Sequence, residues 1–380
     1  MPSKIPFNKP YMTGRELALI ADAHASLHLS GDGKYTKLCN AWLAELSGAK
    51  AALLTHSCTA ALEMSALLCD IKPGDEVIVP SFTFVTTVSS FVMRGAVPVF
   101  IDIRPDTLNM DETKIEAAIT EKTRAIVPVH YAGVGAEMDT IVAIAKKHNL
   151  MVVEDNAQGV MSSFKGKPLG SFGNLAAVSF HETKNIISGE GGALYVNDEA
   201  LIEKAEIIRE KGTNRARFFR GQVDKYTWED LGSSYLPSEI LAAFLWGQIK
   251  EAYEITDRRL KIWKTYHEAF AGLEKEGLVR RPIVPEYCKH NAHMYYLLFN
   301  SLEERTNFIA KMREAGINCV FHYLPLHDSP AGRKFGRFNE ELPVTRKVSD
   351  TLVRLPLWVG LEKDGQLEEV IENVIRIVKR

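Results

Sequence analysis

Short apolar runs that alternate with helix-like segments constrain the fold of this chain more than any other feature of its sequence. The runs are AALLTHSC (51–58), EVIVP (76–80), VPVFIDI (97–103), RAIVPVHY (124–131) and LMVVEDN (150–156). Residues 59–69, 86–94 and 138–147 have the apolar spacing of helices. Strands that alternate with helices form βαβ units with parallel strand pairing. The sequence therefore predicts an α/β fold with a mostly parallel sheet between helices.

The pattern changes near Ser238. From there to about residue 270 the spacing predicts one long helix. Beyond it the pattern predicts two strand-like runs and a terminal amphipathic helix, at 293–300, 317–325 and 367–380. We expect a large α/β domain over residues 1–250 and a smaller C-terminal α+β domain over residues 251–380.

Composition and charge exclude several classes of protein. The 46 Lys and Arg nearly balance the 48 Asp and Glu, so the net charge of −2 gives no bulk attraction to nucleic acid or to an anionic membrane. No run approaches the roughly 18 apolar residues of a membrane helix, and the first 14 residues lack a secretion-signal core. The five cysteines are scattered and contain no C-x-x-C pair, which favours a reducing compartment. A cytoplasmic protein is expected.

Two common ligand sites do not fit the sequence. A dinucleotide-binding turn needs G-x-G-x-x-G, whereas the first predicted strand-to-helix turn is THSCTAAL (55–62), without glycine. A zincin needs a second histidine, which the HETKN run at His181 lacks. His322 and His327 are five residues apart and lack an evident third ligand, so a loop or substrate role is favoured over a metal pair. No metal site is expected.

A carboxylate follows the apolar run that ends at Val153. In open α/β sheets, ligands lie at the carboxyl ends of strands, which is where Asp155 is expected. If this carboxylate is buried it needs a positive partner. The alternative is that Asp155 caps a helix N-terminus.

A lysine with unusual surroundings ends one further strand-like run, 177–184, and precedes another, 192–198. Lys184 precedes the glycine cluster Gly189, Gly191 and Gly192, which permits tight turns and close backbone approach. Such a setting can desolvate a lysine and lower its pKa, as an imine-forming nucleophile requires. The alternative is an ordinary solvated lysine.

The third candidate for a ligand site is the turn Ser57-Cys58-Thr59, which precedes a predicted helix. Backbone N–H groups at a helix N-terminus bind anions, and small residues with a hydroxyl suit a phosphate. Simple N-capping by Ser57 or Thr59 is compatible with that role.

A lysine nucleophile, a carboxylate and a phosphate seat together indicate pyridoxal 5′-phosphate (PLP). PSFTFVTT (80–87) offers Phe82 or Phe84 as a ring to stack on the cofactor, with core packing as the alternative for both.

Seven motifs, in this order along the chain, resemble the DegT/DnrJ/EryC1/StrS family of PLP-dependent nucleotide-sugar aminotransferases. They are SCTAALEM, GDEVIVPSFTFVTT, PVFIDIRPDTLNMD, IVPVHYAG, VVEDNAQG, SFHETKNIISGEGG and FHYLPLH. The resemblance extends over nearly the whole chain. The resemblance implies a fold type I large domain and a homodimer with active sites at the subunit interface.

The resemblance also assigns roles to residues. It implies that Lys184 is the lysine that forms the Schiff base, that Asp155 pairs with the pyridine nitrogen, and that Gln158 borders the ring. Phe84 would stack on the ring, and the residues at the phosphate positions would be Cys58, Thr59 and Ser179. Two departures stand out: Ser234 occupies a position where relatives often have a phosphate-binding asparagine from the partner subunit, and Asn156 replaces a small residue.

Within the family, three segments resemble the bacterial transaminases that form dTDP-4-amino-4,6-dideoxygalactose. They are VPVHYAGV-x-x-EMDTI, IIREKGTNRA-x-FFRGQVDKYTW and SSYL. This resemblance implies transfer of an amino group from L-glutamate to C4 of dTDP-4-dehydro-6-deoxy-D-glucose, for surface polysaccharide of the lipopolysaccharide or enterobacterial common antigen type. Candidate substrate-binding residues are Lys225, His322 and His327. Amination at C3, another sugar, 3-dehydration and a non-catalytic regulatory protein on the same scaffold remain as alternatives.

Overall fold

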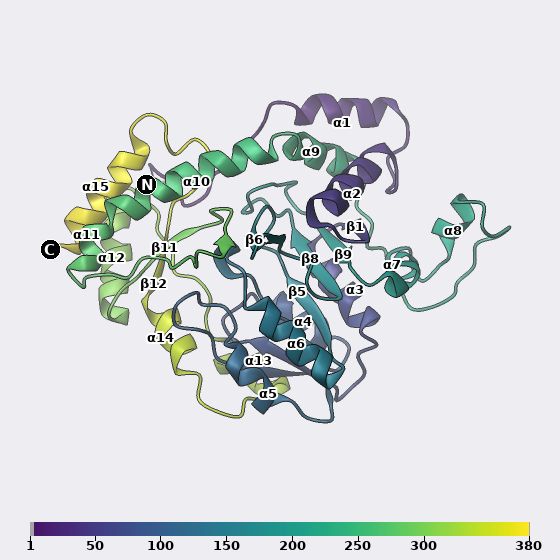
Figure 1. Cartoon of the computed structure of the whole chain (residues 1–380). Helices are drawn as coiled ribbons and strands as arrows, with labels where there is room; N and C mark the ends of the chain where they lie inside the picture. The colour runs from purple at the N-terminus through teal and green to yellow at the C-terminus, as the bar shows by residue number, and fades with distance from the viewer. Residues whose placement is uncertain (1–3, 380) are drawn as a thin grey trace.

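The computed structural model describes residues 4–379 and is built on a seven-stranded sheet with strand order β1-β9-β8-β5-β4-β2-β3 (Figure 1). Strand β9 pairs antiparallel with both of its neighbours, and all other pairs are parallel. The strands of this sheet are β1 (Ala51–Thr55), β2 (Glu76–Pro80), β3 (Val97–Ile101), β4 (Thr123–Ile126), β5 (Met151–Asp155), β8 (Leu175–Ser179) and β9 (Gly192–Val196). The predicted α/β fold with a mostly parallel sheet is confirmed.

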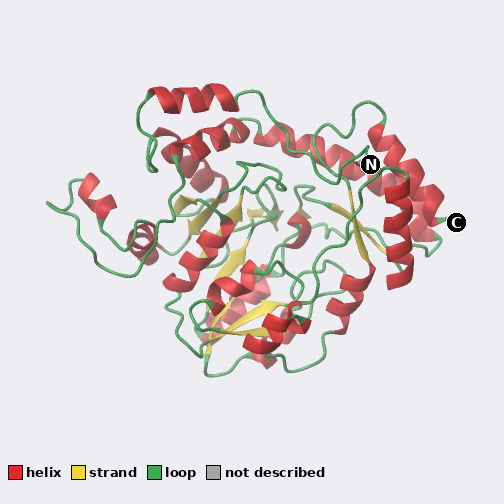
Figure 2. Cartoon of the chain, turned by 180° about the vertical axis from the view of Figure 1, so that it is seen from behind, coloured by secondary structure: helices red, strands yellow, loops and turns green. Residues whose placement is uncertain are grey.

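Helices cover both faces of the sheet (Figure 2). Those of the first 250 residues are α1 (Glu16–Ala25), α2 (Lys34–Ser47), α3 (Cys58–Leu68), α4 (Thr86–Val92), α5 (Ile115–Ala118), α6 (Met138–His148), α7 (Ile202–Arg209), α8 (Arg215–Phe219) and α9 (Glu239–Ile249). Alternate strand residues point to opposite faces: Leu53 packs with α3 and α4, whereas Ala52 and Leu54 pack with α2 and α9. The strands are therefore apolar on both faces, as central parallel strands require.

The later part of the chain has its own apolar core. Its elements are α10 (Ala252–Ala269), α11 (Ala271–Lys275), β11 (Tyr295–Leu298), α12 (Leu302–Glu314), α13 (Pro330–Phe335), α14 (Pro343–Thr351), β12 (Leu352–Leu355) and α15 (Gln366–Val378). Strands β11 and β12 pair antiparallel. Ile5 pairs with Ile317 and is fully buried in this core, so the amino-terminal segment packs against the far end of the chain. A small sheet of β6 (Ser163–Phe164), β7 (Lys167–Pro168) and β10 (Cys288–Lys289) links the two parts.

Two sequence-based expectations need correction. The helix expected from Ser238 to about residue 270 is interrupted at Lys250 and Glu251, where Glu251 leaves helical geometry and α9 gives way to α10. The run at 317–325 forms isolated bridges at Ile317 and Val320 rather than a strand. Its second half turns toward the cleft described below, and Pro325 has no N–H group for a ladder. The domain boundary at 250/251 falls at the break between α9 and α10 and stays a prediction.

Helix α8 and the loops on either side of it stand away from the body of the molecule in both views (Figures 1 and 2). Exposed aromatic side chains gather on this arm, among them Phe219 and Trp228. Across residues 4–379, none of the helices combines the length and the apolarity needed to cross a bilayer.

Candidate functional site

A cleft of about 620 Å³ lies at the carboxyl ends of the parallel strands. The first part of the chain contributes the turn before α3, the loop after β2, the end of β5 and the loop between β8 and β9. The C-terminal part closes the other side with β12 and the segments before β11 and after residue 320, and Phe7 and Asn8 complete the lining. The side chains proposed from sequence at Cys58, Thr59, Phe84, Asp155, Gln158, Ser179, Lys184 and His322 all line this cleft.

Asp155 ends strand β5 with its carboxylate buried at 4% exposure. Its Oδ2 accepts a hydrogen bond from Thr87 Oγ1 at 2.6 Å, and its Oδ1 accepts one from the Ala157 N–H at 3.1 Å. No Lys, Arg or His of the described chain lies within ion-pair distance of it. A buried carboxylate that lines a cleft without a cationic partner is costly. The site therefore suits a ligand that brings a positive charge or a bound proton to Asp155.

Lys184 lies in the loop between β8 and β9. The loop is closed by backbone hydrogen bonds from Glu182 N–H to Gly189 C=O and from Ser188 N–H to Phe180 C=O, at 2.8 and 2.7 Å. Burial is the main cause that lowers the pKa of the Lys184 ammonium, and the Arg354 charge lowers it further, while Cys58 and Asp155 act in the opposite direction. A lysine with a lowered pKa has more of the neutral amine needed for nucleophilic attack and proton transfer.

The N-terminus of α3 faces the same cleft. Ser57 caps the helix, its Oγ accepting from the Ala60 N–H at 3.1 Å, so the N–H groups of Cys58 and Thr59 have no acceptor among residues 4–379. Burial raises the pKa of the Cys58 thiol well above its ordinary value, which keeps the sulfur neutral and compatible with an anion. Two free N–H groups and the helix dipole make an anion seat. The capping and anion-binding interpretations of this turn are thus compatible.

Glycine allows β9 to lie against the turn before α3. A Cβ on Gly192 would lie 2.4 Å from the Cys58 nitrogen and from the Ser57 carbonyl carbon. Gly192 also pairs with Thr55 on one side and with Ser179 on the other. The glycine therefore brings the anion seat and the loop that carries Lys184 to one place.

Gln158 and Phe84 lie on the cleft wall. Gln158 Oε1 accepts from the Ala132 N–H at 2.7 Å and its Nε2 donates to Tyr323 Oη at 3.0 Å, which fixes the amide. Phe84 is 55% exposed, whereas Phe82 is buried against Tyr131. A half-exposed aromatic ring in a cleft is available to stack on a flat ligand, and the core role open to both phenylalanines applies to Phe82.

Three proposed residues lie apart from this cleft within the one chain described. His327 is fully buried, and its Nδ1 is 2.6 Å from Ser81 Oγ. Ser234 and Lys225 lie on exposed loops that flank the projecting arm. His322 does line the cleft, with Nδ1 2.7 Å from Tyr131 Oη, and burial lowers its pKa well below the ordinary value, which favours neutral imidazole.

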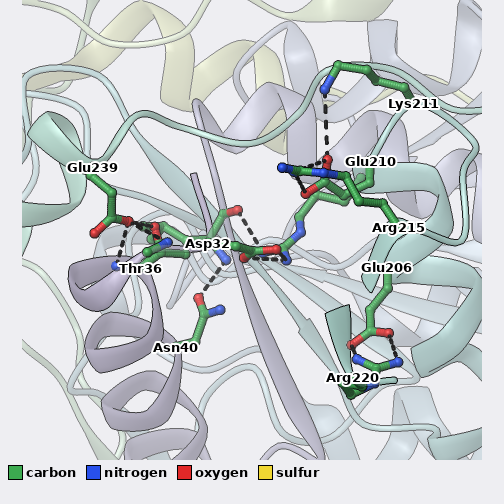
Figure 3. A network of polar contacts seen from close by, with 12 residues as sticks. Asp32, Thr36, Asn40, Glu206, Glu210, Lys211, Arg215, Arg220 and Glu239 are labelled. Atoms are coloured by element: carbon green, nitrogen blue, oxygen red, sulfur yellow. Dashed lines mark hydrogen bonds and ion pairs between the residues drawn. The ribbon is translucent and has the colours of Figure 1, made fainter. Parts of the chain in front are cut away.

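The basic residues around the arm are mostly paired with carboxylates of α7 and its C-cap. Arg220 bonds Glu206, Arg215 bonds Glu210, and Lys211 lies 3.8 Å from Glu210 (Figure 3). Lys225 forms no ion pair with any described residue. Among these cations Lys225 is therefore the one left for a ligand.

Asn156, one of the departures noted from the sequence, points behind the cleft. Its Nδ2 donates to the Leu169 C=O at 3.0 Å. A Cβ on Gly159 would meet Asn156 Oδ1 at 2.1 Å, and one on Gly170 would meet its Nδ2 at 2.8 Å. The larger residue is thus accommodated by glycines at both positions.

Two arginines in the cleft were not among the residues predicted from the sequence. Buried Arg259 comes from α10 and Arg354 from β12, and neither forms an ion pair with a described carboxylate. Arg259 donates to the carbonyls of Ala292 and His293 at 3.1 and 2.7 Å. Both arginines lie in segments whose local pattern is that of ordinary helix or strand, so only the tertiary fold identifies them.

Comparison with known proteins agrees with this geometry. A sequence model of the DegT/DnrJ/EryC1/StrS aminotransferase family matches residues 10–375. The spore coat polysaccharide biosynthesis protein SpsC of Bacillus subtilis is 34% identical over 383 residues, covering 99% of this chain and 97% of SpsC.

Solved structures share the whole architecture. S. venezuelae DesV, in complex with a ketimine intermediate, superposes with a TM-score of 0.90 at 28% identity, with 100% of both chains covered. The PLP form of Spr1654 from Streptococcus pneumoniae superposes with a TM-score of 0.89 at 28% identity, covering 99% of this chain and 98% of that one.

The residues of the cleft fit PLP. The cationic pyridine nitrogen would satisfy the unpartnered carboxylate of Asp155, the phosphate would occupy the free N–H groups at the start of α3, and the aldehyde would meet the amine of Lys184. The motifs, the cleft and the relatives agree: this chain belongs to the DegT/DnrJ/EryC1/StrS aminotransferase family, and its cofactor is pyridoxal phosphate.

Proposed function

We propose that this enzyme is a nucleotide-sugar aminotransferase that moves the amino group of L-glutamate to C4 of dTDP-4-dehydro-6-deoxy-D-glucose. The products would be 2-oxoglutarate and dTDP-4-amino-4,6-dideoxy-D-galactose. We further propose that the product enters surface polysaccharide of the lipopolysaccharide or enterobacterial common antigen type. The dTDP-sugar assignment is based on the three subgroup-like segments, and SpsC supports a polysaccharide pathway by its name.

One observation carries the proposed chemistry: Lys184, with its lowered pKa, lines the same cleft as the buried, unpaired carboxylate of Asp155. When bound, PLP supplies an aldehyde that condenses with amines and a ring that accepts the electrons of a carbanion. Asp155 would keep a proton on the ring nitrogen, and Thr87 and the Ala157 N–H orient its carboxylate.

Lys184 would be the catalytic base and acid. In the first half-reaction, its free Nζ would take the proton from Cα of L-glutamate and deliver it to the cofactor carbon that carried the aldehyde. In the second half-reaction, Nζ would carry a proton in the reverse direction, ending at C4 of the sugar. A neutral amine is needed to begin each transfer, and the lowered pKa supports that state.

The other cleft residues would hold the cofactor. Gln158, fixed by Ala132 and Tyr323, would border the ring, and Phe84 would stack on it. The phosphate would lie on the N–H groups of Cys58 and Thr59, with Ser179 beside them. His322, hydrogen-bonded to Tyr131 and with a pKa lowered by burial, would face the substrate as a neutral imidazole. Since His327 is buried against Ser81, it is not included in the proposed substrate site.

We propose that the active enzyme is a homodimer with shared active sites. The exposed aromatic arm around α8 is suited to cover a second subunit, because such side chains are otherwise left in water. In that arrangement Ser234 and Lys225 would approach the partner's cleft, where the free ammonium of Lys225 would meet the diphosphate of the substrate.

The test is to incubate the purified enzyme with PLP, L-glutamate and dTDP-4-dehydro-6-deoxyglucose and to identify the product. We expect nuclear magnetic resonance to show an axial amino group at C4, as in the galactose configuration, and mass spectrometry to show replacement of oxygen by NH and two hydrogens. Amination at C3 or loss of the C3 hydroxyl would contradict the proposal. Lys184→Ala should abolish turnover, and near-normal turnover by this variant would contradict the role given to Lys184.

A further inference from the structure

Arg354 is a cation in the catalytic cleft that the fold leaves without an anion. It lines the cleft from β12 and forms no ion pair with a described carboxylate. Its guanidinium makes a single hydrogen bond, a long one of 3.4 Å from Nη2 to the Phe321 C=O, and its Nε is buried without a partner. An arginine carries five N–H donors, so most of this hydrogen-bonding capacity is unused.

The position of this guanidinium is fixed even though its donors are free. Its Cζ lies 4.7 Å from the centroid of the Phe7 ring, and its backbone forms hydrogen bonds in both directions with Val320. A planar cation held on an aromatic face loses little conformational freedom when an anion binds. The group is therefore preorganised rather than loosely solvated.

The second arginine of the cleft is a useful contrast. Arg259 donates hydrogen bonds from Nε and Nη2 to the Ala292 and His293 carbonyls, which links α10 to the segment before β11. These hydrogen bonds give Arg259 a structural role. The guanidinium of Arg354 makes no comparable pair of hydrogen bonds, so its N–H groups are available to a ligand.

Two arguments identify the ligand. The cofactor phosphate already has a seat at α3, on a different element, so a second anion belongs to a substrate. Arg354 also lies near enough to Lys184 for its charge to lower the pKa of that amine. The reacting carbon must meet Lys184, and in an amino acid the α-carboxylate is bonded directly to that carbon. In a 4-keto sugar nucleotide, by contrast, the diphosphate is attached across the ring from C4.

We propose that Arg354 binds the α-carboxylate of the amino donor through its guanidinium fork, and so acts as a specificity residue for the first half-reaction. The inference rests on the proposed aminotransferase function. An arginine fork matches a carboxylate with two parallel hydrogen bonds. The same anion would also neutralise the cation that faces Lys184.

The experiment separates the two half-reactions of Arg354→Gln. The PLP form is mixed with L-glutamate, the pyridoxamine form is mixed with the keto sugar nucleotide, and the cofactor absorbance is followed in each. We expect the apparent second-order rate constant with L-glutamate to fall by about 10- to 100-fold, as for loss of a charged hydrogen-bond partner. The rate with the sugar nucleotide should change less than about threefold. Arg354→Lys should recover part of the loss, because the charge remains without the fork.

Binding gives a readout that is independent of turnover. Glutarate, a dicarboxylate that cannot react, should bind the PLP form by calorimetry and lose affinity in Arg354→Gln, while dTDP should bind both proteins equally. Arg305→Gln is the matched control: Arg305 stacks over Phe321 at 5.6 Å and donates to the Asp350 C=O, but does not line the cleft. It should leave both half-reactions unchanged.

Different failures have different meanings. Loss confined to the sugar nucleotide half-reaction and to dTDP binding would overturn the inference and assign Arg354 to the diphosphate. Unchanged kinetics and glutarate binding in Arg354→Gln would overturn it as well. If the wild-type enzyme accepts an amino group from L-glutamate but transfers none to the sugar nucleotide, the proposed function fails while the test of Arg354 remains valid.

Discussion

Gly192 is the residue at which strand β9 approaches the turn before α3 most closely. The approach leaves no room for a Cβ beside Cys58 and Ser57. The glycine cluster was recognised in the sequence as a site of close backbone approach, but the partner could not be named. The reason is physical: the turn at 57–59 is more than 130 residues away along the chain, and only the antiparallel pairing of β1 with β9 brings them together.

We expect Gly192→Ala to lower both stability and cofactor affinity. The added methyl would displace the helix N-terminus that holds the phosphate, with an overpacking cost of about 1–3 kcal/mol. The measurements are chemical unfolding and PLP titration. Gly272→Ala is the control, since a Cβ there meets nothing within 4 Å and α11 favours alanine, so its stability should be unchanged or slightly higher. Equal PLP affinity in Gly192→Ala and wild type would contradict this account.

The lowered pKa of Lys184 predicts how the rate of PLP attachment depends on pH. Its pKa is lowered from the ordinary value of 10.5, chiefly by burial. Protonated amine predominates below the pKa and cannot attack an aldehyde, so the rate of covalent attachment of PLP to the apoenzyme should rise with pH and level off below pH 10.5. The measurement is borohydride trapping followed by mass spectrometry across pH. Nα-acetyl-lysine with PLP is the control, and a coincident pH profile would show that Lys184 is not perturbed.

At the scale of elements, the sequence predicted most strands and helices because their apolar spacing is local. What it could not predict is how one element completes another. The N-cap residue of helix α2 is Gly33, which has no side chain to cap the helix. Glu239 of α9 supplies the missing acceptor: its carboxylate accepts from the N–H groups of Gly33, Tyr35 and Thr36 and from the Thr36 hydroxyl (Figure 3). This cap spans more than 200 residues of sequence and follows no local rule.

Removal of this cap should be costly. Glu239→Ala leaves three buried N–H groups without an acceptor, and we expect the free energy of unfolding to fall by about 3 kcal/mol. Glu239→Gln keeps the shape but places an NH₂ group among donors, so its loss should be intermediate. Glu254→Ala on the exposed face of α10 is the control and should stay within about 0.5 kcal/mol of wild type. Similar unfolding curves for Glu239→Ala and Glu254→Ala would contradict the capping role.

At the scale of the whole molecule, the projecting arm is the feature that one chain leaves unexplained. Phe219 and Trp228 are 69% and 77% exposed. From the sequence, Lys225 in this region is a candidate substrate-binding residue, whereas the fold pairs the neighbouring cations Lys211, Arg215 and Arg220 with carboxylates near α7. In the proposed homodimer the second subunit would bury these side chains, so neither the local sequence pattern nor the fold of one chain identifies what they contact.

We expect the double variant Phe219→Asp with Trp228→Asp to sediment as a monomer and to lose activity, since two charges would replace the apolar contacts of the arm. Light scattering and analytical ultracentrifugation measure the mass. Leu302→Asp, a 48% exposed leucine at the start of α12, is the control and should remain dimeric. A double variant with the mass and activity of wild type would show that the arm does not join subunits.

The amino-terminal segment contacts both the core of the C-terminal part and the loop that carries Lys184. Ile5 forms a β-bridge with Ile317, and the Phe7 ring lies under the guanidinium of Arg354. Asn8 donates a hydrogen bond of 3.2 Å to the Glu182 carbonyl, in the loop between β8 and β9. If Arg354 binds the amino donor as proposed, removal of residues up to Phe7 should weaken that binding, because the guanidinium would lose the aromatic ring on which it lies. Recombinant material for kinetics should carry its affinity tag after α15.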